Sequence, residues 1–327
     1  MEARFAGAAC VAAAVLSLGA GHRTPNFVVQ AASPQVAEQV GEAAEQFRRD
    51  LAVEWLGREM PNWTNPCPIE VNVGPNLGAG GATTFMFDRG PTGNMEAFGW
   101  QMSIQGSLER VLDSVLPHEV THTIFASHFR RPLPRWADEG ACGTVEHDSE
   151  RQKQQGALVH YLRTRRGIPF SQMFAMKEYP RDILPLYAQG HSLATFLIAQ
   201  GGKRKYLKYV GAGLHGEEWT RVTREFYGFD NLGALQNGWL EWVRKGSRLP
   251  LAASAVATSS TDDAGEALAR VEPLDVQPEQ DEPAQLASSQ LDPARRRVPK
   301  GPARAARDVE HTSVYDGRAR RRDALRR

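Results

Sequence analysis

The chain has few cysteines, no internal repeats and no apolar run long enough to span a membrane comfortably. Its longest apolar run, Phe5 to Leu18, is shorter than a bilayer-spanning helix. Cys10 lies inside that run, so the remaining cysteines, Cys67 and Cys142, allow one disulfide at most. The net charge of +1 gives the whole chain no bias toward nucleic acid. The length of 327 residues allows one large domain or two small ones.

The N-terminal residues 1–21 have the pattern of a secretory signal. Arg4 supplies a positive start, Phe5 to Leu18 is apolar and rich in alanine, and small residues follow. We therefore expect an exported protein (periplasmic, in the cell envelope or extracellular), or an anchored one if the segment is not cleaved. In such a protein Cys67 and Cys142 form either a disulfide or two buried thiols.

The next hundred residues alternate strand and helix patterns. Ser33 followed by Pro34 is typical of a helix start, and apolar residues at spacings of three and four continue to a stop near Gly57. Strands are predicted at 26–30, 68–73, 83–87 and 99–105, the last two joined by a Gly/Pro/Asn-rich loop at 88–96. From about residue 150 to 246 the pattern is mostly helical, with helices expected at 183–199, 204–210, 219–227 and 232–243.

The composition changes after Leu249. Residues 251–292 carry nine acids and one Arg, and residues 293–327 carry twelve Lys/Arg and four acids. Such a segment cannot bury enough apolar surface to fold alone. We therefore predict a folded domain over 22–249, with no nucleic-acid partner, and a disordered tail over 250–327. Its basic half could contact anionic surfaces.

The segment His118-Glu119-Val120-Thr121-His122 reads H-E-x-x-H. On a helix, positions four apart lie on one face, so both imidazoles can bind one metal ion. Glu119 beside them can take a proton from a metal-bound water. Pro117 fits only the first turn of a helix, which predicts a start near Asp113 or Ser114, or a kink at Pro117.

A catalytic zinc site needs a third protein ligand. Glu139 is the leading candidate, because the sixteen residues after His122 leave room for a loop and a second helix. His128 lies ten residues after His118, but Phe125 stands where a Gly would turn the chain toward it. Asp138 and His147 are further alternatives.

The segment Trp136-Ala137-Asp138-Glu139-Gly140 carries a family resemblance. H-E-x-x-H followed by Trp-x-x-Glu-Gly resembles the gluzincin branch of zinc peptidases, in a largely uncharacterised bacterial group of the peptidase MA-like superfamily. The resemblance implies an α+β, zincin-like fold: a small mixed or antiparallel sheet, an active-site helix and a mostly helical C-terminal half. It makes Glu139 the third ligand of one Zn²⁺ ion.

The resemblance also implies an oxyanion donor and a substrate-binding strand. Tyr187 and His191, four residues apart, are the candidate donors. The strand Trp100 to Ile104 is either a substrate-binding edge or an ordinary core strand. The predicted function is hydrolysis of peptide bonds in a peptide or protein substrate, with Glu119 as general base. The alternatives are a non-catalytic zinc-stabilised binding module and a hydrolase of a non-peptide amide.

Overall fold

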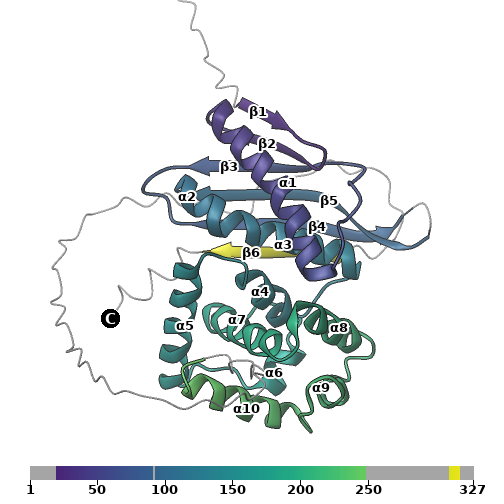
Figure 1. The fold of residues 1–327 in the computed structure, drawn as a ribbon, viewed down its shortest axis with the longest axis vertical. Coiled ribbons are helices and arrows are strands. Elements are labelled where there is room, and N and C mark those ends of the chain that lie inside the picture. The colour runs from purple at the N-terminus through teal and green to yellow at the C-terminus, as the bar shows by residue number, and fades with distance from the viewer. Residues whose placement is uncertain (1–19, 91–92, 248–308, 317–327) are drawn as a thin grey trace, which may run out of the picture. The chain divides into compact units, whose positions relative to one another are not determined.

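The structure, a computed structural model, describes residues 20–90, 93–247 and 309–316. The predicted signal segment lies outside these residues except for Ala20 and Gly21, and so does the predicted tail except for Val309–Asp316. The described strands form one six-stranded sheet in the order β1-β2-β3-β5-β4-β6 (Figure 1). Their bounds are β1 Ala20–Arg23, β2 Phe27–Ala31, β3 Cys67–Val73, β4 Gly80–Arg89, β5 Met95–Gly106 and β6 Val309–Asp316.

The sheet is mixed. Strands β2, β3 and β5 run parallel to one another, whereas β1, β4 and β6 pair antiparallel with their neighbours. Burial alternates along β2 and β3, so that Phe27, Val29 and Ile69 face the core. The predicted α+β class, a small sheet followed by a mostly helical half, is confirmed. None of the helices described here combines the length and apolar character needed to cross a bilayer.

Helix α1 (Pro34–Leu56) begins and ends at the predicted residues. The Ser33 side chain accepts a hydrogen bond of 3.2 Å from the backbone N–H of Val36. Gly57, at a φ of 78°, ends the helix in the left-handed conformation that glycine adopts without strain. The apolar face of α1 packs on β1 and β2, and Trp55 near its end is fully buried.

The helix that carries the H-E-x-x-H segment starts earlier than predicted. Helix α2 (Leu108–Arg110) leads through a π-helical turn, η1 (Val111–Val115), into α3 (Leu116–Phe129). Pro117 has no N–H to donate, and its ring would clash with a carbonyl one regular turn back. The wider π turn immediately before Pro117 accommodates the ring, so the chain stays helical.

Strand β5 cannot be a substrate-binding edge, so that prediction for Trp100 to Ile104 is wrong. It lies between two partners, pairing in parallel with β3 and antiparallel with β4. From Met102 to Ile104, both rows of backbone hydrogen-bonding groups are therefore used within the sheet. The alternative prediction, an ordinary core strand, fits β5, because Met102 and Ile104 are buried.

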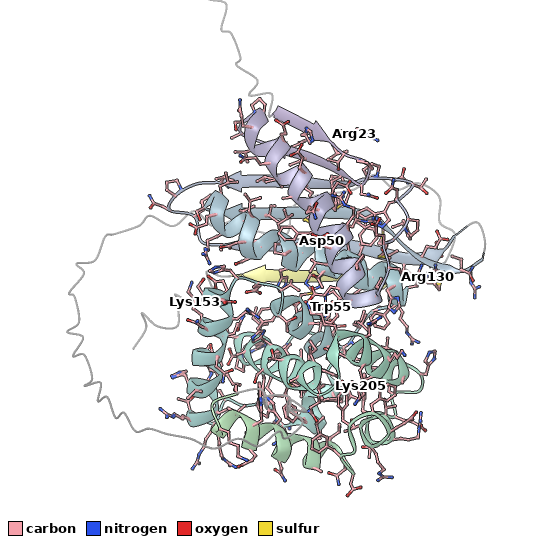
Figure 2. All side chains as sticks on the ribbon, viewed as in Figure 1. Arg23, Asp50, Trp55, Arg130, Lys153 and Lys205 are labelled. Atoms are coloured by element: carbon pink, nitrogen blue, oxygen red, sulfur yellow. The ribbon has the colours of Figure 1, made fainter. Side chains whose placement is uncertain are left out.

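The described chain from Arg135 to Arg244 is helical, as predicted for residues from about 150 to 246. Its elements are α4 Arg135–Gly143, α5 Asp148–Arg163, α6 Phe170–Ala175, α7 Leu184–Ala199, α8 Gly202–Leu214, α9 Trp219–Tyr227 and α10 Leu232–Arg244. An aromatic cluster forms its centre, in which Trp136 of α4 stacks on Phe174 and meets Trp219 edge-on. Among the side chains drawn in Figure 2, Arg23, Arg130 and Lys153 are exposed, in contrast to the buried Trp55.

Two glycines let α4 and α7 cross in backbone contact. A Cβ added at Gly140 would overlap the carbonyl oxygen of Gly190, and one at Gly190 would lie 2.8 Å from the carbonyl oxygen of Trp136. No other residue fits at either position without separating the helices. The crossing therefore fixes the position of α4, including Glu139.

Replacing Gly140 with Ala should destabilise the fold by about 1–3 kcal/mol through overpacking. At about 2–4 °C per kcal/mol for a domain of this size, thermal denaturation should show a clear drop in Tm. The matched control is Gly156→Ala on exposed α5, where an added Cβ meets nothing within 4 Å. That change should be neutral or stabilising. Equal effects of the two substitutions would contradict the close crossing.

Candidate metal site

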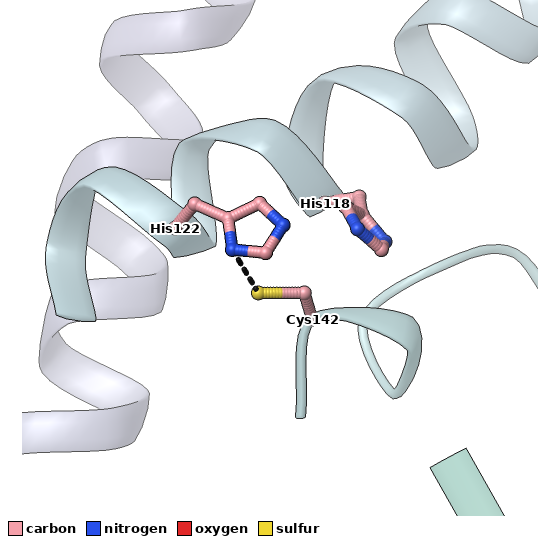
Figure 3. Close-up of side chains that lie close together, drawn as sticks. All are labelled: His118, His122 and Cys142. Atoms are coloured by element: carbon pink, nitrogen blue, oxygen red, sulfur yellow. Dashed lines mark hydrogen bonds between the residues drawn. The ribbon is translucent and has the colours of Figure 1, made fainter. Parts of the chain in front are cut away.

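Helices α3 and α4 bring three metal-ligating side chains together. Ligand atoms of His118, His122 and Cys142 lie within 4.8 Å of one another, and all three residues are buried. Figure 3 shows both imidazoles of α3 above the Cys142 thiol of α4, with the Sγ 3.3 Å from His122 Nδ1. Groups of this composition can hold a metal ion. Cys142 is not among the metal ligands predicted from the sequence.

Each imidazole is oriented by a carboxylate at its Nδ1 atom. His118 Nδ1 lies 2.9 Å from Glu146 Oε1, and His122 Nδ1 lies 2.9 Å from Asp138 Oδ1. An ionised carboxylate can only accept, so each Nδ1 carries a proton. The lone pair for a metal is then on Nε2. Carboxylate–histidine pairs of this kind are the usual support of metal-binding imidazoles.

Both Nε2 atoms face one oxygen of Glu139. The distances to Glu139 Oε2 are 3.5 Å from His118 Nε2 and 3.8 Å from His122 Nε2. Tetrahedral zinc with ligands at about 2.0–2.2 Å separates its ligand atoms by about 3.3–3.6 Å. Both distances are therefore close to the separation of two ligand atoms on one ion.

Glu119 lies beside these atoms, between α3 and β4. Its Oε2 accepts a hydrogen bond of 2.6 Å from Thr83 Oγ1. Its Oε1 is buried and has no hydrogen-bond partner among the described residues. Burial raises the pKa of Glu119, although the nearby imidazoles and the Thr83 hydroxyl act in the opposite direction. A carboxylate with a raised pKa is a better proton acceptor.

Strand β4 leaves space for Glu119 only because residue 81 is glycine. A Cβ at Gly81 would lie 2.7 Å from Glu119 Oε1 and 2.9 Å from Val115 Cγ1. The β4 backbone therefore approaches the carboxylate without a side chain in between. Together with Thr83, Gly81 makes β4 one wall of the site.

The charges of the site are strongly coupled. Burial lowers the pKa of His118, but hydrogen bonds to Glu139 and Glu146 outweigh it and raise that pKa to about 10. Asp138 likewise outweighs burial at His122 and raises its pKa. The pKa of Glu139 is lowered, because His118 and His122 outweigh its burial. A metal ion competes with the protons on these imidazoles.

A tyrosine that the sequence analysis did not single out supports Glu139. The Tyr179 hydroxyl donates a hydrogen bond to Glu139 Oε1. The Arg135 guanidinium carbon lies 4.2 Å from the centre of the Tyr179 ring. Tyr179 lies between α6 and α7, where no local pattern indicated a functional residue. Glu146 was also missed; the only signal in the sequence was its position shortly after the Trp-x-x-Glu-Gly segment.

The two predicted oxyanion donors lie on α7, close to this network. The Tyr187 ring contacts that of Tyr179, with their centroids 6.4 Å apart. His191 lies against α4, where a Cβ at Gly143 would be 3.2 Å from its Nδ1. Both side chains are buried. In this structure Tyr187 thus neighbours a tyrosine that bonds Glu139, and His191 neighbours the end of α4.

The alternative ligands have other surroundings. His128 is exposed beside Phe129, and its pKa is lowered by partial desolvation and by the nearby Arg58 and Arg130. His147 is exposed and caps α5, accepting a hydrogen bond of 3.3 Å from the Ser149 N–H. Asp138 contacts the Nδ1 atom of His122, as described above.

The two cysteines form no disulfide. Cys67 and Cys142 are both buried free thiols, which is the second of the two expectations drawn from the sequence. Burial raises the pKa of each thiol.

Comparisons of the whole chain with protein-family models, curated proteins and solved structures give no match.

Removing either carboxylate behind the imidazoles should weaken metal binding by about 10–100-fold, because these groups set the tautomer and raise the basicity of the ligands. The variants are Asp138→Asn and Glu146→Gln, titrated with Zn²⁺ against a chelating dye. His128→Ala, elsewhere on α3, is the control and should bind Zn²⁺ as the unmodified chain does. Unchanged affinity in both carboxylate variants would show that the metal binds elsewhere.

Proposed function

We propose that the chain is a zinc-dependent metallopeptidase that hydrolyses peptide bonds with Glu119 as general base. The observation that carries this proposal is the convergence of both Nε2 atoms on Glu139 Oε2, 3.5 and 3.8 Å away, beside a buried Glu119 oxygen with no described hydrogen-bond partner. Unpaired buried polar atoms are rare and call for a functional explanation. The resemblance of H-E-x-x-H and Trp-x-x-Glu-Gly to gluzincins supports the same proposal.

We take Glu139 rather than Cys142 as the third ligand. The Cys142 thiol approaches His122 at Nδ1, the atom that donates to Asp138. The Glu139 carboxylate approaches both imidazoles at Nε2, where their lone pairs point. Tyr179 holds the other oxygen of Glu139 and so favours binding through a single oxygen. His118, His122 and Glu139 would therefore hold the ion.

A bound zinc ion would supply a water of lowered pKa and polarise the carbonyl of the scissile amide. Glu119 Oε1 would accept the water proton and later deliver it to the leaving amine. Thr83 would hold Glu119 Oε2 and direct Oε1 toward the reacting groups. The removal of Glu119 from solvent keeps its pKa raised, which suits a group that must take up and release a proton.

The second donor to the developing oxyanion would come from the α7 region. Tyr187 and His191 are our candidates from the sequence: Tyr187 lies beside Tyr179, which bonds Glu139, and His191 lies beside α4. The substrate would be a peptide or protein met after export. An intact general base beside two imidazoles supports hydrolysis over a role as a zinc-stabilised binding module.

Metal retention separates the two ligand sets. Glu139→Gln should lower Zn²⁺ affinity by more than about 100-fold, because loss of an outer partner alone costs 10–100-fold. Cys142→Ser should bind Zn²⁺ nearly as tightly as the unmodified chain. The measurement is the zinc content of the purified chain after dialysis against graded chelator. If Cys142→Ser lost zinc and Glu139→Gln kept it, the ligands would be His118, His122 and Cys142.

Catalysis is tested with a fluorogenic peptide library and the Glu119→Gln variant. The substitution keeps the shape of the side chain and removes the base, so cleavage should fall by about 10²–10⁴-fold. Zinc content should stay at one ion per chain. Equal cleavage by both proteins would trace the activity to a contaminant and would contradict the role of Glu119 as general base.

A further inference from the structure

The outer edge of β4 runs alongside the proposed catalytic base. Thr83 of β4 donates to Glu119, and only glycine fits at Gly81 because the carboxylate lies against the backbone there. On its inner edge β4 pairs with β5. Any chain that pairs with its outer edge therefore lies next to Gly81 and Thr83, within a strand spacing of about 4.8 Å.

Strand β6 occupies this outer edge in the structure. It runs antiparallel to β4, with Tyr315 opposite Gly81 and Ser313 opposite Thr83. It also contacts α3, the helix of both imidazoles. Figure 1 shows β6 in yellow beside β4 and α3. A segment from the C-terminal region thus lies where an added extended strand would meet the site.

The site is closed to solvent with β6 in place. His118 and Glu139 are each 2 % exposed, and Glu119 is 0 % exposed. A catalytic metal site needs an open position for water and for the bond to be cut. One strand edge accepts one partner, so β6 and an extended peptide cannot pair with β4 at the same time.

We propose that β6 closes this site from within the same chain, because it occupies the edge of β4 with which an extended peptide would pair. The proposal rests on the proposed function in that it gives the site a peptide ligand and an internal competitor. The recognised chemistry is an extended peptide backbone, paired antiparallel with β4. Release of Val309–Asp316 from the edge is then the step that opens the site.

The main test disrupts β6 in the full chain with the double substitution Ser313→Pro and Val314→Pro. Adjacent residues of a strand direct their N–H groups to opposite edges, so one of the two prolines removes a hydrogen bond to β4 whatever the phase of the ladder. The matched control places two prolines at Ala305 and Ala306, outside the described residues. Thermal denaturation checks that both variants keep the fold.

Two readouts do not depend on hydrolysis, and both use Glu119→Gln as background. Hydrogen exchange of the β4 amides that face β6 should accelerate at least about 10-fold in the double variant and stay unchanged in the control, whereas the amides that face β5 should stay protected in both. A labelled octapeptide with the sequence of residues 309–316 should bind the double variant roughly 10–100-fold more tightly than the parent, where the tethered strand competes at high effective concentration. Unchanged exchange, or equal peptide binding by both proteins, would overturn the proposal.

The third readout is cleavage of the peptide library with Glu119 restored. The double variant should have a kcat/KM at least about 10-fold above that of the unmodified chain, because β6 no longer occupies the β4 edge and peptide can bind there. Peptide binding without cleavage would uphold the β4 edge while removing the proposed hydrolysis. Full cleavage by the unmodified chain, with β4 amides still protected, would show that substrate uses another surface.

Discussion

The packing of α4 between α3 and α7 decides where Glu139 lies, and the rest of the site depends on that position. On one side, the close crossing of Gly140 and Gly190 locks α4 to α7. On the other, α4 packs on α3, which carries both imidazoles. The buried Trp136 anchors the same helix in the aromatic cluster. These contacts hold the Glu139 carboxylate beside the imidazoles of His118 and His122, which belong to a different helix.

The charge balance of this centre favours a cation. Four carboxylates surround the two imidazoles, and all six side chains are buried: Glu119, Asp138, Glu139, Glu146, His118 and His122. Even with both imidazoles protonated, these carboxylates leave an excess of negative charge when all are ionised. Burying uncompensated charge is costly, and proteins relieve that cost by proton uptake or by metal binding. The raised pKa values of Glu119 and His118 show the first response in the protein alone. A divalent cation is the second.

Local signals in the sequence were sufficient for the features that depend on neighbouring residues. The cap at Ser33, the stop at Gly57 and the face shared by His118 and His122 follow from short-range geometry. The order of strands in the sheet does not, which is why β5 was taken for a possible edge. Glu146 and Tyr179 lie 28 and 40 residues from their partners, so only the folded chain identifies them. Strand β6 lies in a segment whose charged composition masks Val309, Val314 and Tyr315.

The absence of a side chain at Gly81 links the sheet to the site. It lets the β4 backbone contact Glu119. This contact also places β4 next to α3, the helix that carries both imidazoles. A larger residue would move the strand away from Glu119, and a peptide paired with the displaced edge would no longer pass beside the base. Under the proposed function, the alignment of the substrate and the environment of Glu119 would both depend on this one contact. Strand β6 pairs with the same part of β4, with Tyr315 opposite Gly81.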